Sequence, residues 1–372
     1  MAKQATTLKE LAQIRADRRD FLNAIVGTQG TALGLKNFDA TDKLTGDPCI
    51  IVYVPHKIHR ALLSENAVIP SKLTSRDGKL ESPTDVIVTT VPNKTKNTPS
   101  LSAENQEIIE TLQWLNGKMD FIGPGVQVGA ADVSSGQLET FVGTLGYIVR
   151  SKNDNKLIGF LTNQHVGLHS GHSLYIPGYR QNAIRVGVTR RVMEHRPDDE
   201  WLKGLDEKFA YVRTDSAFAV ADEGLGSHMR NDVLGIGPMG SPFEIDLDSM
   251  DIIGMPVKKL GRTTGLQLGT IIAFGYGIGG EEEFIDRNIN VEPANFYTDL
   301  LIAPRGTSTV FSAPGDSGSA ILIDTDDTNK DRPVALLWGG WPTDIGRSRG
   351  VEDLTYGIGL NRILQALELE LL

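Results

Sequence analysis

The feature that most constrains the fold is a succession of short apolar runs, each closed by a glycine-rich or polar turn, from about residue 119 onward. They include "GTLGYIVRS", "LIGFLTN", "SAFAVAD", "GTIIAFGYG", "YTDLLIA", "SAILI" and "VALLWGG". Runs of this length and spacing predict many short strands in an antiparallel barrel or sandwich. The 40 glycines among 372 residues are typical of such turns.

The first 118 residues follow another pattern. Thr7 followed by Glu10 resembles a capping box, and the apolar spacing after it predicts an amphipathic helix over residues 7–26. Its apolar stripe must be buried against this region or a neighbouring subunit. β-branched runs predict strands near residues 48–58 and 84–92, and a helix is expected over residues 104–118.

Two regions are therefore expected: an α/β accessory region over residues 1–118 and a β-rich domain over residues 119–372, making the chain α+β overall. The last run, "NRILQALELELL", is expected to form a C-terminal helix.

Composition excludes several function classes. A net charge of −10 and a pI near 5.3 disfavour a nucleic-acid partner, and no window approaches the 18 apolar residues of a membrane span. Cys49 is the only cysteine, so no intrachain disulfide can form. Together with the lack of a signal-peptide apolar run at the start, this predicts a cytoplasmic protein.

The stretch "SAPGDSGSAILI" places Ser317 between an acid and a glycine, directly before a buried strand. It is either a nucleophile or a small residue in a tight turn. A nucleophilic serine needs a base and an acid that orients the base. The decision therefore depends on whether the rest of the chain supplies those two residues.

His165 is the candidate base, because the run "LIGFLTNQHV" carries it at the end of a predicted strand. His169 and His172 follow closely and raise a zinc alternative. Their spacing lacks the glutamate of the H-E-x-x-H motif and the segment is too rich in glycine for a helix, so no metal is expected. The loosely glycine-rich "GYGIGG" has no P-loop lysine after it, so no nucleotide or other cofactor is expected either.

Asp215 is the candidate acid, because it begins the apolar run "DSAFAVAD", where a buried carboxylate needs a partner such as an imidazole N–H. Asp222 ends the same run and is the alternative. The order His165, Asp215, Ser317 is that of chymotrypsin-like enzymes and differs from the order in α/β-hydrolases.

"GDSGS" together with "LTNQHV" resembles the trypsin/chymotrypsin-fold serine peptidases. "TDSAFAVAD", "KKLGRTTGLQLGTI" and "RPVALLWGG…YGIGLNRILQALELELL" narrow the resemblance to the plant Narrow Leaf proteins and their prokaryotic relatives. This resemblance implies a chymotrypsin-like double β-barrel protease domain with an N-terminal accessory region. It also implies an intracellular peptidase that forms homo-oligomers.

The resemblance assigns roles to matching positions. His165, Asp215 and Ser317 correspond to the catalytic triad, and the backbone N–H groups of Gly315 and Ser317 to the oxyanion hole. The strand that binds the substrate backbone corresponds to Leu337, Trp338 and Gly339, and the floor of the specificity pocket to Phe311, six residues before Ser317. Asp316 matches an acid that pairs with a newly cut N-terminus in secreted relatives, so it needs another counter-charge here.

We therefore expect a cofactor-independent serine endopeptidase that acts on protein or peptide substrates, in a regulatory or defence role. A phenylalanine floor favours cleavage after uncharged, apolar residues. The alternative from another class is a binding or scaffold protein that keeps the protease fold and hydrolyses little.

Overall fold

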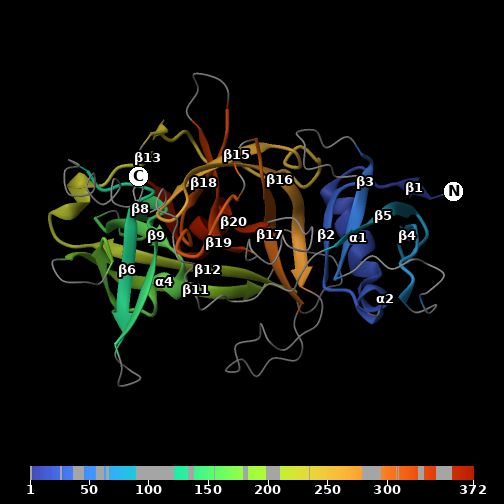
Figure 1. Cartoon of the computed structure of the whole chain (residues 1–372), viewed down its shortest axis with the longest axis horizontal. Helices are drawn as coiled ribbons and strands as arrows, with labels where there is room; N and C mark the ends of the chain where they lie inside the picture. Colours follow the sequence, from blue (N-terminus) through green and yellow to red (C-terminus); the bar gives the residue numbers. More distant parts are fainter. Residues whose placement is uncertain are drawn as a thin grey trace.

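The computed structural model describes residues 2–25, 27–36, 46–55, 63, 67–88, 121–132, 138–154, 156–178, 183–197, 210–233, 235–278, 295–306, 308, 310–325, 331–340 and 354–372. Within these ranges most of the chain forms β-strands, arranged as two barrels with a smaller N-terminal region beside the second (Figure 1). The helix expected over residues 104–118 lies outside the described residues.

The first barrel, on the left in Figure 1, is closed by antiparallel pairing alone. The strands pair in the order β6, β10, β11, β12, β9 and β8, and β7 pairs with the other edge of β6. Since β7 and β8 are separated only by Leu145 and Gly146, they act as one bent strand that closes the ring. The bounds are β6 Gln127–Asp132, β7 Glu139–Thr144, β8 Tyr147–Ser151, β9 Ile158–Thr162, β10 Ser173–Ile176, β11 Ile184–Pro197 and β12 Ala210–Ala221.

The second barrel closes in the same way, in the order β15, β16, β17, β20, β19, β18 and back to β15. Its strands are β15 Pro256–Gly261, β16 Gly265–Ile278, β17 Asn295–Pro304, β18 Ala320–Ile323, β19 Arg332–Gly340 and β20 Thr355–Gly359. In the chain between β12 and β15, β13 Asp232–Val233 and β14 Gly237–Pro238 form a separate two-stranded ribbon. The expected chymotrypsin-like double β-barrel is therefore confirmed, and so is the α+β class.

Tyr147 of β8 joins the two barrels from the inside. Its hydroxyl lies 2.9 Å from the carbonyl oxygen of Ile321 and 2.6 Å from that of Ala335, both in the second barrel. Burial raises the pKa of Tyr147 well above its usual value, so the hydroxyl keeps its proton and can donate it. The barrels are also joined by a short parallel pairing between β12 and β17.

The N-terminal region extends the second barrel rather than standing apart from it. β2 (Gly30–Leu35) pairs antiparallel with β16, and the sheet continues through β3 (Pro48–Val54) to β5 (Leu80–Val88). β1 (Lys3–Gln4) and β4 (Lys72–Thr74) flank β5 at its start. β3 and β5 are the strands expected near residues 48–58 and 84–92, whereas β2 was not expected.

The helix expected over residues 7–26 is two helices, α1 (Leu8–Asp17) and α2 (Arg19–Ala24). Thr7 caps α1 as expected, by accepting a hydrogen bond from the backbone N–H of Glu10. The helix breaks at Arg18, whose φ of −113° and ψ of 9° are not helical. Arg18 Nε donates a hydrogen bond of 2.5 Å to the carbonyl oxygen of Thr74, and this tertiary contact favours the break.

The break changes which side chains of this segment are buried. Leu8, Leu11 and Ile14 of α1 are buried in a hydrophobic core shared with β2, β3 and β16. Phe21 of α2, expected on the same stripe, is 47% exposed, because the new helix starts in a different phase.

The C-terminal helix is shorter than expected. α6 spans Leu360–Ala366, and the last residues form β21 (Leu369–Leu371), which pairs antiparallel with β8. Glu368 has a positive φ of 54°, which ends the helical path and turns the chain toward the first barrel. In the described residues no helix is long and apolar enough to cross a membrane.

Candidate active site

His165 and Asp215 form a hydrogen-bonded pair at one end of the first barrel. His165 lies in the short helix α4 (Gln164–Gly167) directly after β9, and Asp215 lies in the middle of β12, which pairs with β9. His165 Nδ1 is 2.7 Å from Asp215 Oδ2, and the His165 backbone N–H donates to Asp215 Oδ1 at 3.1 Å. Both carboxylate oxygens therefore hold the same histidine.

Burial alone would raise the pKa of the Asp215 carboxyl, but the charge of His165, its hydrogen bonds and the charge of Arg213 outweigh burial and lower it. An ionised carboxylate can only accept hydrogen bonds, so it favours the imidazole tautomer with the proton on Nδ1. Nε2 of His165 is then the basic nitrogen, on a side chain that is 47% exposed.

The backbone of Asp215 is strained, with a φ of 33°, which is uncommon for a residue that has a Cβ. Asn163, fully buried, donates from Nδ2 to the Asp215 carbonyl oxygen at 2.8 Å and helps to hold this conformation. Such strain is kept where surrounding contacts enforce it, and it is common at functional sites.

Ser317 lies in the tight turn between Phe311 and β18. Gly315 and Gly318 have positive φ angles of 98° and 91°, which glycine adopts at little cost. Within the described residues, the backbone N–H groups of Gly315 and Ser317 donate no hydrogen bond. The turn therefore holds two backbone donors beside the serine that no described residue uses.

The turn is attached to the first barrel. The Thr144 backbone N–H donates to the Ser317 carbonyl oxygen at 2.8 Å, and Thr144 Oγ1 donates to that of Gly315 at 3.0 Å. A Cβ placed on Gly318 would lie 3.4 Å from the backbone nitrogen of Asn163, two residues before His165. The serine turn is thus packed against the segment that carries the histidine.

Ser317 and His165 are both among the described residues, and Ser317 Oγ makes no hydrogen bond to His165. The fold therefore joins His165 to Asp215 directly and brings Ser317 close through backbone contacts.

Asp316 has an internal counter-charge. Lys259 of β15 lies 2.9 Å from its carboxylate, and both side chains are fully buried. The carboxylate also accepts hydrogen bonds from the backbone N–H groups of Thr263, Thr264 and Ala313. Nothing in the sequence pattern singled out Lys259, because its partner lies 57 residues away. The alternation along β15 is the only local hint, since Lys258 faces outward and Lys259 inward.

The residues expected to bind substrate lie beside the serine turn. The Leu337 carbonyl oxygen accepts from the backbone N–H of Gly318 at 2.8 Å, so β19 runs directly along the turn. Trp338 is the extra residue of a register shift between β19 and β20. Phe311 is buried with Leu337 in one hydrophobic core.

The alternatives considered for the site lie apart from this pair. Asp222 bonds to Arg185 at 2.8 Å on the surface and not to His165. His172 bonds through Nδ1 to the backbone of His169, and no group of three or more metal-binding side chains occurs among the described residues. The described part of "GYGIGG" belongs to β16 and not to a loop.

Residues 104–372 match the family described as the Nal1 C-terminal domain, and residues 3–87 match the NARROW LEAF 1 N-terminal domain. The chain belongs to the Narrow Leaf 1 family. Protein NARROW LEAF 1 of Oryza sativa subsp. japonica is 31% identical over 386 aligned positions, which cover 100% of this chain and 61% of the rice protein.

Solved structures similar to this family member include a Nocardiopsis protease (TM-score 0.40, 18% identity, 67% of this chain and 99% of that chain). A Cellulomonas bogoriensis chymotrypsin is similar at a TM-score of 0.37 and 18% identity, over 68% of this chain and 99% of that chain. Membership of the family rests on the sequence matches.

Proposed function

We propose that this chain is a serine endopeptidase in which Ser317 is the nucleophile, His165 the general base and Asp215 the residue that orients the base. The observation that carries the proposal is the 2.7 Å contact between His165 Nδ1 and Asp215 Oδ2. It directs the basic Nε2 away from the acid, so that this nitrogen can take a proton from a serine hydroxyl.

The reaction then follows from the positions of these groups. Ser317 Oγ attacks the peptide carbonyl while His165 accepts its proton, and the free N–H groups of Gly315 and Ser317 stabilise the negative charge on the carbonyl oxygen. His165 returns the proton to the leaving amine, and water hydrolyses the acyl-enzyme by the same steps. The reaction needs no cofactor.

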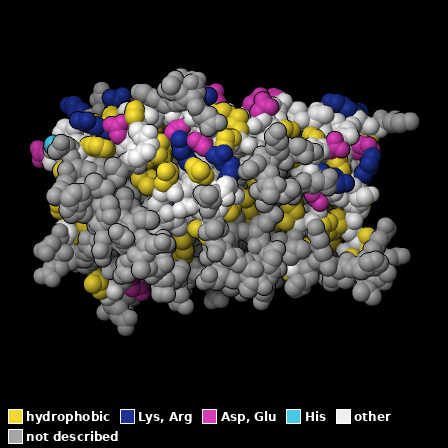
Figure 2. Space-filling model, turned by 45° about the horizontal axis from the view of Figure 1, so that its top comes forward, with side chains coloured by type: hydrophobic (Ala, Val, Ile, Leu, Met, Phe, Trp, Pro, Cys, Tyr) yellow, Lys and Arg dark blue, Asp and Glu magenta, His cyan; other side chains and the backbone are white. Residues whose placement is uncertain are grey.

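The proposed substrate is a protein or peptide bound along Leu337, Trp338 and Gly339 of β19. Where the structure describes the surface in Figure 2, basic and acidic side chains are interspersed. This mixture, with a net charge of −10, supports a partner other than nucleic acid. The buried single cysteine, Cys49, is compatible with the proposed cytoplasmic location.

We also propose that the chain forms a homo-oligomer. The apolar stripe of α1 is covered by its own chain, so the interface must use another surface. Light scattering on the full chain measures this directly, and a monomer at micromolar concentration would contradict it.

A fluorophosphonate probe tests the enzyme proposal, because it reacts only with an activated serine. We expect labelling of the wild type and none of Ser317→Ala, and strongly reduced labelling of His165→Ala. If the folded wild type fails to react with any serine-directed probe, a protease-fold binding or scaffold protein becomes the better account. Circular dichroism of each variant controls for folding.

A further inference from the structure

Arg213 of β12 is a buried arginine whose charge acts on Asp215 but whose side chain donates no hydrogen bond within the described residues. The residue is 8% exposed, and its Nε is buried without a hydrogen bond. Within the described residues it forms no salt bridge, and Asp215, two positions along the strand, uses both carboxylate oxygens for His165. Because Asp215 gives its hydrogen bonds to His165, the Arg213 guanidinium keeps unused donors at a site where burial strengthens electrostatic attraction, so it is suited to bind an anion.

The guanidinium lies beside the proposed substrate strand. Its central carbon is 4.8 Å from the ring centroid of Trp338. Trp338 directly follows Leu337, whose carbonyl oxygen accepts from Gly318, the residue after Ser317. Arg213 lies two residues before Asp215, which bonds to His165. The Arg213–Trp338 contact therefore joins the strand that carries Asp215 to the strand that runs along the serine turn.

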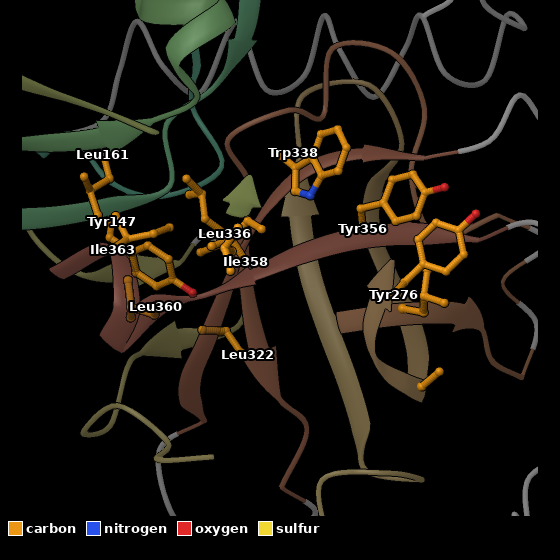
Figure 3. Close-up of a cluster of buried hydrophobic side chains, with 14 of the residues drawn as sticks. Tyr147, Leu161, Tyr276, Leu322, Leu336, Trp338, Tyr356, Ile358, Leu360 and Ile363 are labelled. Atoms are coloured by element: carbon orange, nitrogen blue, oxygen red, sulfur yellow. The ribbon is translucent and has the colours of Figure 1, made fainter. Parts of the chain in front are cut away.

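The indole is a fixed platform for the guanidinium. Trp338 Nε1 donates to Thr298 Oγ1 at 2.9 Å, and its ring stacks on Tyr356 with centroids 4.9 Å apart. Tyr356 in turn stacks on Tyr276, and Figure 3 shows the three rings in one row. Because these contacts hold the indole in place, packing orients the guanidinium, and its terminal N–H groups, unlike the buried Nε–H, can reach a ligand.

We propose that Arg213 is a specificity-determining residue that binds a carboxylate of the peptide substrate, on the N-terminal side of the residue whose carbonyl Ser317 attacks. The inference rests on the proposed peptidase function. A planar guanidinium can donate two parallel hydrogen bonds to a carboxylate, which a lysine ammonium cannot match. The substrate class is therefore a peptide with an acidic residue shortly before an uncharged residue at the cleavage point.

Matched peptides test this inference. The starting peptide is the best-cleaved sequence from a peptide-library digest. A single Glu is placed in turn at each of the three positions that precede the residue whose carbonyl is attacked, and each such peptide has a counterpart with Gln at that position. We expect one position at which Glu raises kcat/KM about tenfold over Gln, mainly through KM. Arg213→Gln should reduce this Glu/Gln ratio to about one, and Arg213→Lys should retain part of it.

Arg332→Gln is the control variant. Arg332 also stacks on an aromatic ring, that of Phe243, but lies at the opposite end of β19 from Trp338. This variant should keep the wild-type Glu/Gln ratio. A purely structural role of Arg213 would lower the cleavage of Glu and Gln peptides alike and leave the ratio unchanged.

Two results would overturn the inference while the peptidase proposal stands. One is a wild type that cleaves Glu and Gln peptides equally at all three positions, a measurement that does not depend on any variant folding. The other is an Arg213→Gln variant with the wild-type ratio. By contrast, a wild type that cleaves no peptide and does not react with fluorophosphonate refutes the peptidase function itself, and this inference with it.

Discussion

Lys259 Nζ lies 2.9 Å from Asp316 Oδ2, and neither side chain is exposed to solvent. Burial lowers the pKa of Lys259, while the charge and hydrogen bond of Asp316 oppose that shift. Since Asp316 directly precedes Ser317, the pair holds the serine turn in place. This counter-charge is part of the folded chain, so the turn needs no newly cut N-terminus to hold Asp316.

Removing the lysine charge should be strongly destabilising. Lys259→Met leaves the Asp316 carboxylate buried without its counter-charge, so we expect a loss of about 3–5 kcal/mol in the free energy of unfolding, measured by urea titration. Adding Asp316→Asn to this variant should recover part of the loss. Lys258→Met is the matched control, because the neighbouring lysine is partly exposed and its loss should cost less. A Lys259→Met loss no larger than the control would contradict this role.

Asp215→Asn should reduce kcat by about 10⁴-fold with the fold intact. An amide in place of the carboxylate can no longer favour the imidazole tautomer with the proton on Nδ1, so Nε2 is no longer the basic nitrogen. Asp222→Asn should have little effect, because Asp222 is paired with Arg185 on the surface. Cleavage rates of one peptide by the two variants decide between these acids. A large loss in Asp222→Asn alone would show that the wrong acid was chosen.

The lowered pKa of Asp215 predicts how stability depends on pH. Because the carboxyl titrates below its ordinary value of 3.8 in the folded state, its ionised form stabilises the fold above that pH. This contribution is lost as pH falls below about 4 and through the folded-state pKa. Unfolding of the wild type and Asp215→Asn should be compared from pH 7 to pH 3. Other carboxyls titrate in both proteins, so their contribution cancels in the difference between the two free energies of unfolding. This difference should shrink in the acid range as Asp215 becomes protonated, and a constant difference would count against the lowered pKa.

Gly315→Ala should impair catalysis more than stability. A Cβ at Gly315 would lie 2.5 Å from Arg262 Nη1 and from Thr263 Oγ1, at a φ of 98°. Alanine is strained at this φ, and relief of the strain and of the two close contacts would shift the turn and with it the proposed oxyanion donor, so we expect kcat to fall by about 10²-fold or more. Gly235→Ala separates sterics from backbone strain, because Gly235 also has a positive φ but no atom within 4 Å of its Cβ position. Equal losses of kcat in both variants would argue against a role in the oxyanion hole.

The sequence predicts those parts of the fold that depend on local patterns. Short apolar runs between glycine turns predicted many short strands in a barrel or sandwich, because strand length and turn chemistry are local properties. That the strands form two barrels was implied by the family resemblance. The break at Arg18 could not be predicted, because it depends on a hydrogen bond to Thr74 that only the tertiary fold brings close. The C-terminal "LEL" fits a helix and a strand equally well, and pairing with β8 decides in favour of the strand.

In the candidate site, too, residues marked by a local pattern could be predicted, and residues defined by a tertiary contact could not. His165 and Asp215 could be paired from the sequence because each is an unusual polar residue at one end of an apolar run, although Asp215 lies in the middle of β12. Lys259 could not, since an inward-facing lysine is recognised only once its distant partner is known to be buried beside it. Arg213 likewise looks like an ordinary strand residue until its closeness to Trp338 is seen.

Phe311 predicts cleavage after uncharged, apolar residues. Its side chain is 1% exposed and reaches β16, where a Cβ on Gly269 would lie 2.7 Å from its ring. Ser312 Oγ bonds to Thr355 Oγ1 at 2.6 Å, and a Cβ on Gly340 would lie 3.1 Å from Ser312 Oγ. These neighbouring residues are uncharged, as Phe311 is. Burying a charged side chain here would cost several kcal/mol, whereas an apolar one gains about 1.5–3 kcal/mol. Digestion of a proteome-derived peptide library should therefore give ends dominated by small and medium apolar residues, and dominant cleavage after Lys, Arg, Asp or Glu would refute the apolar pocket.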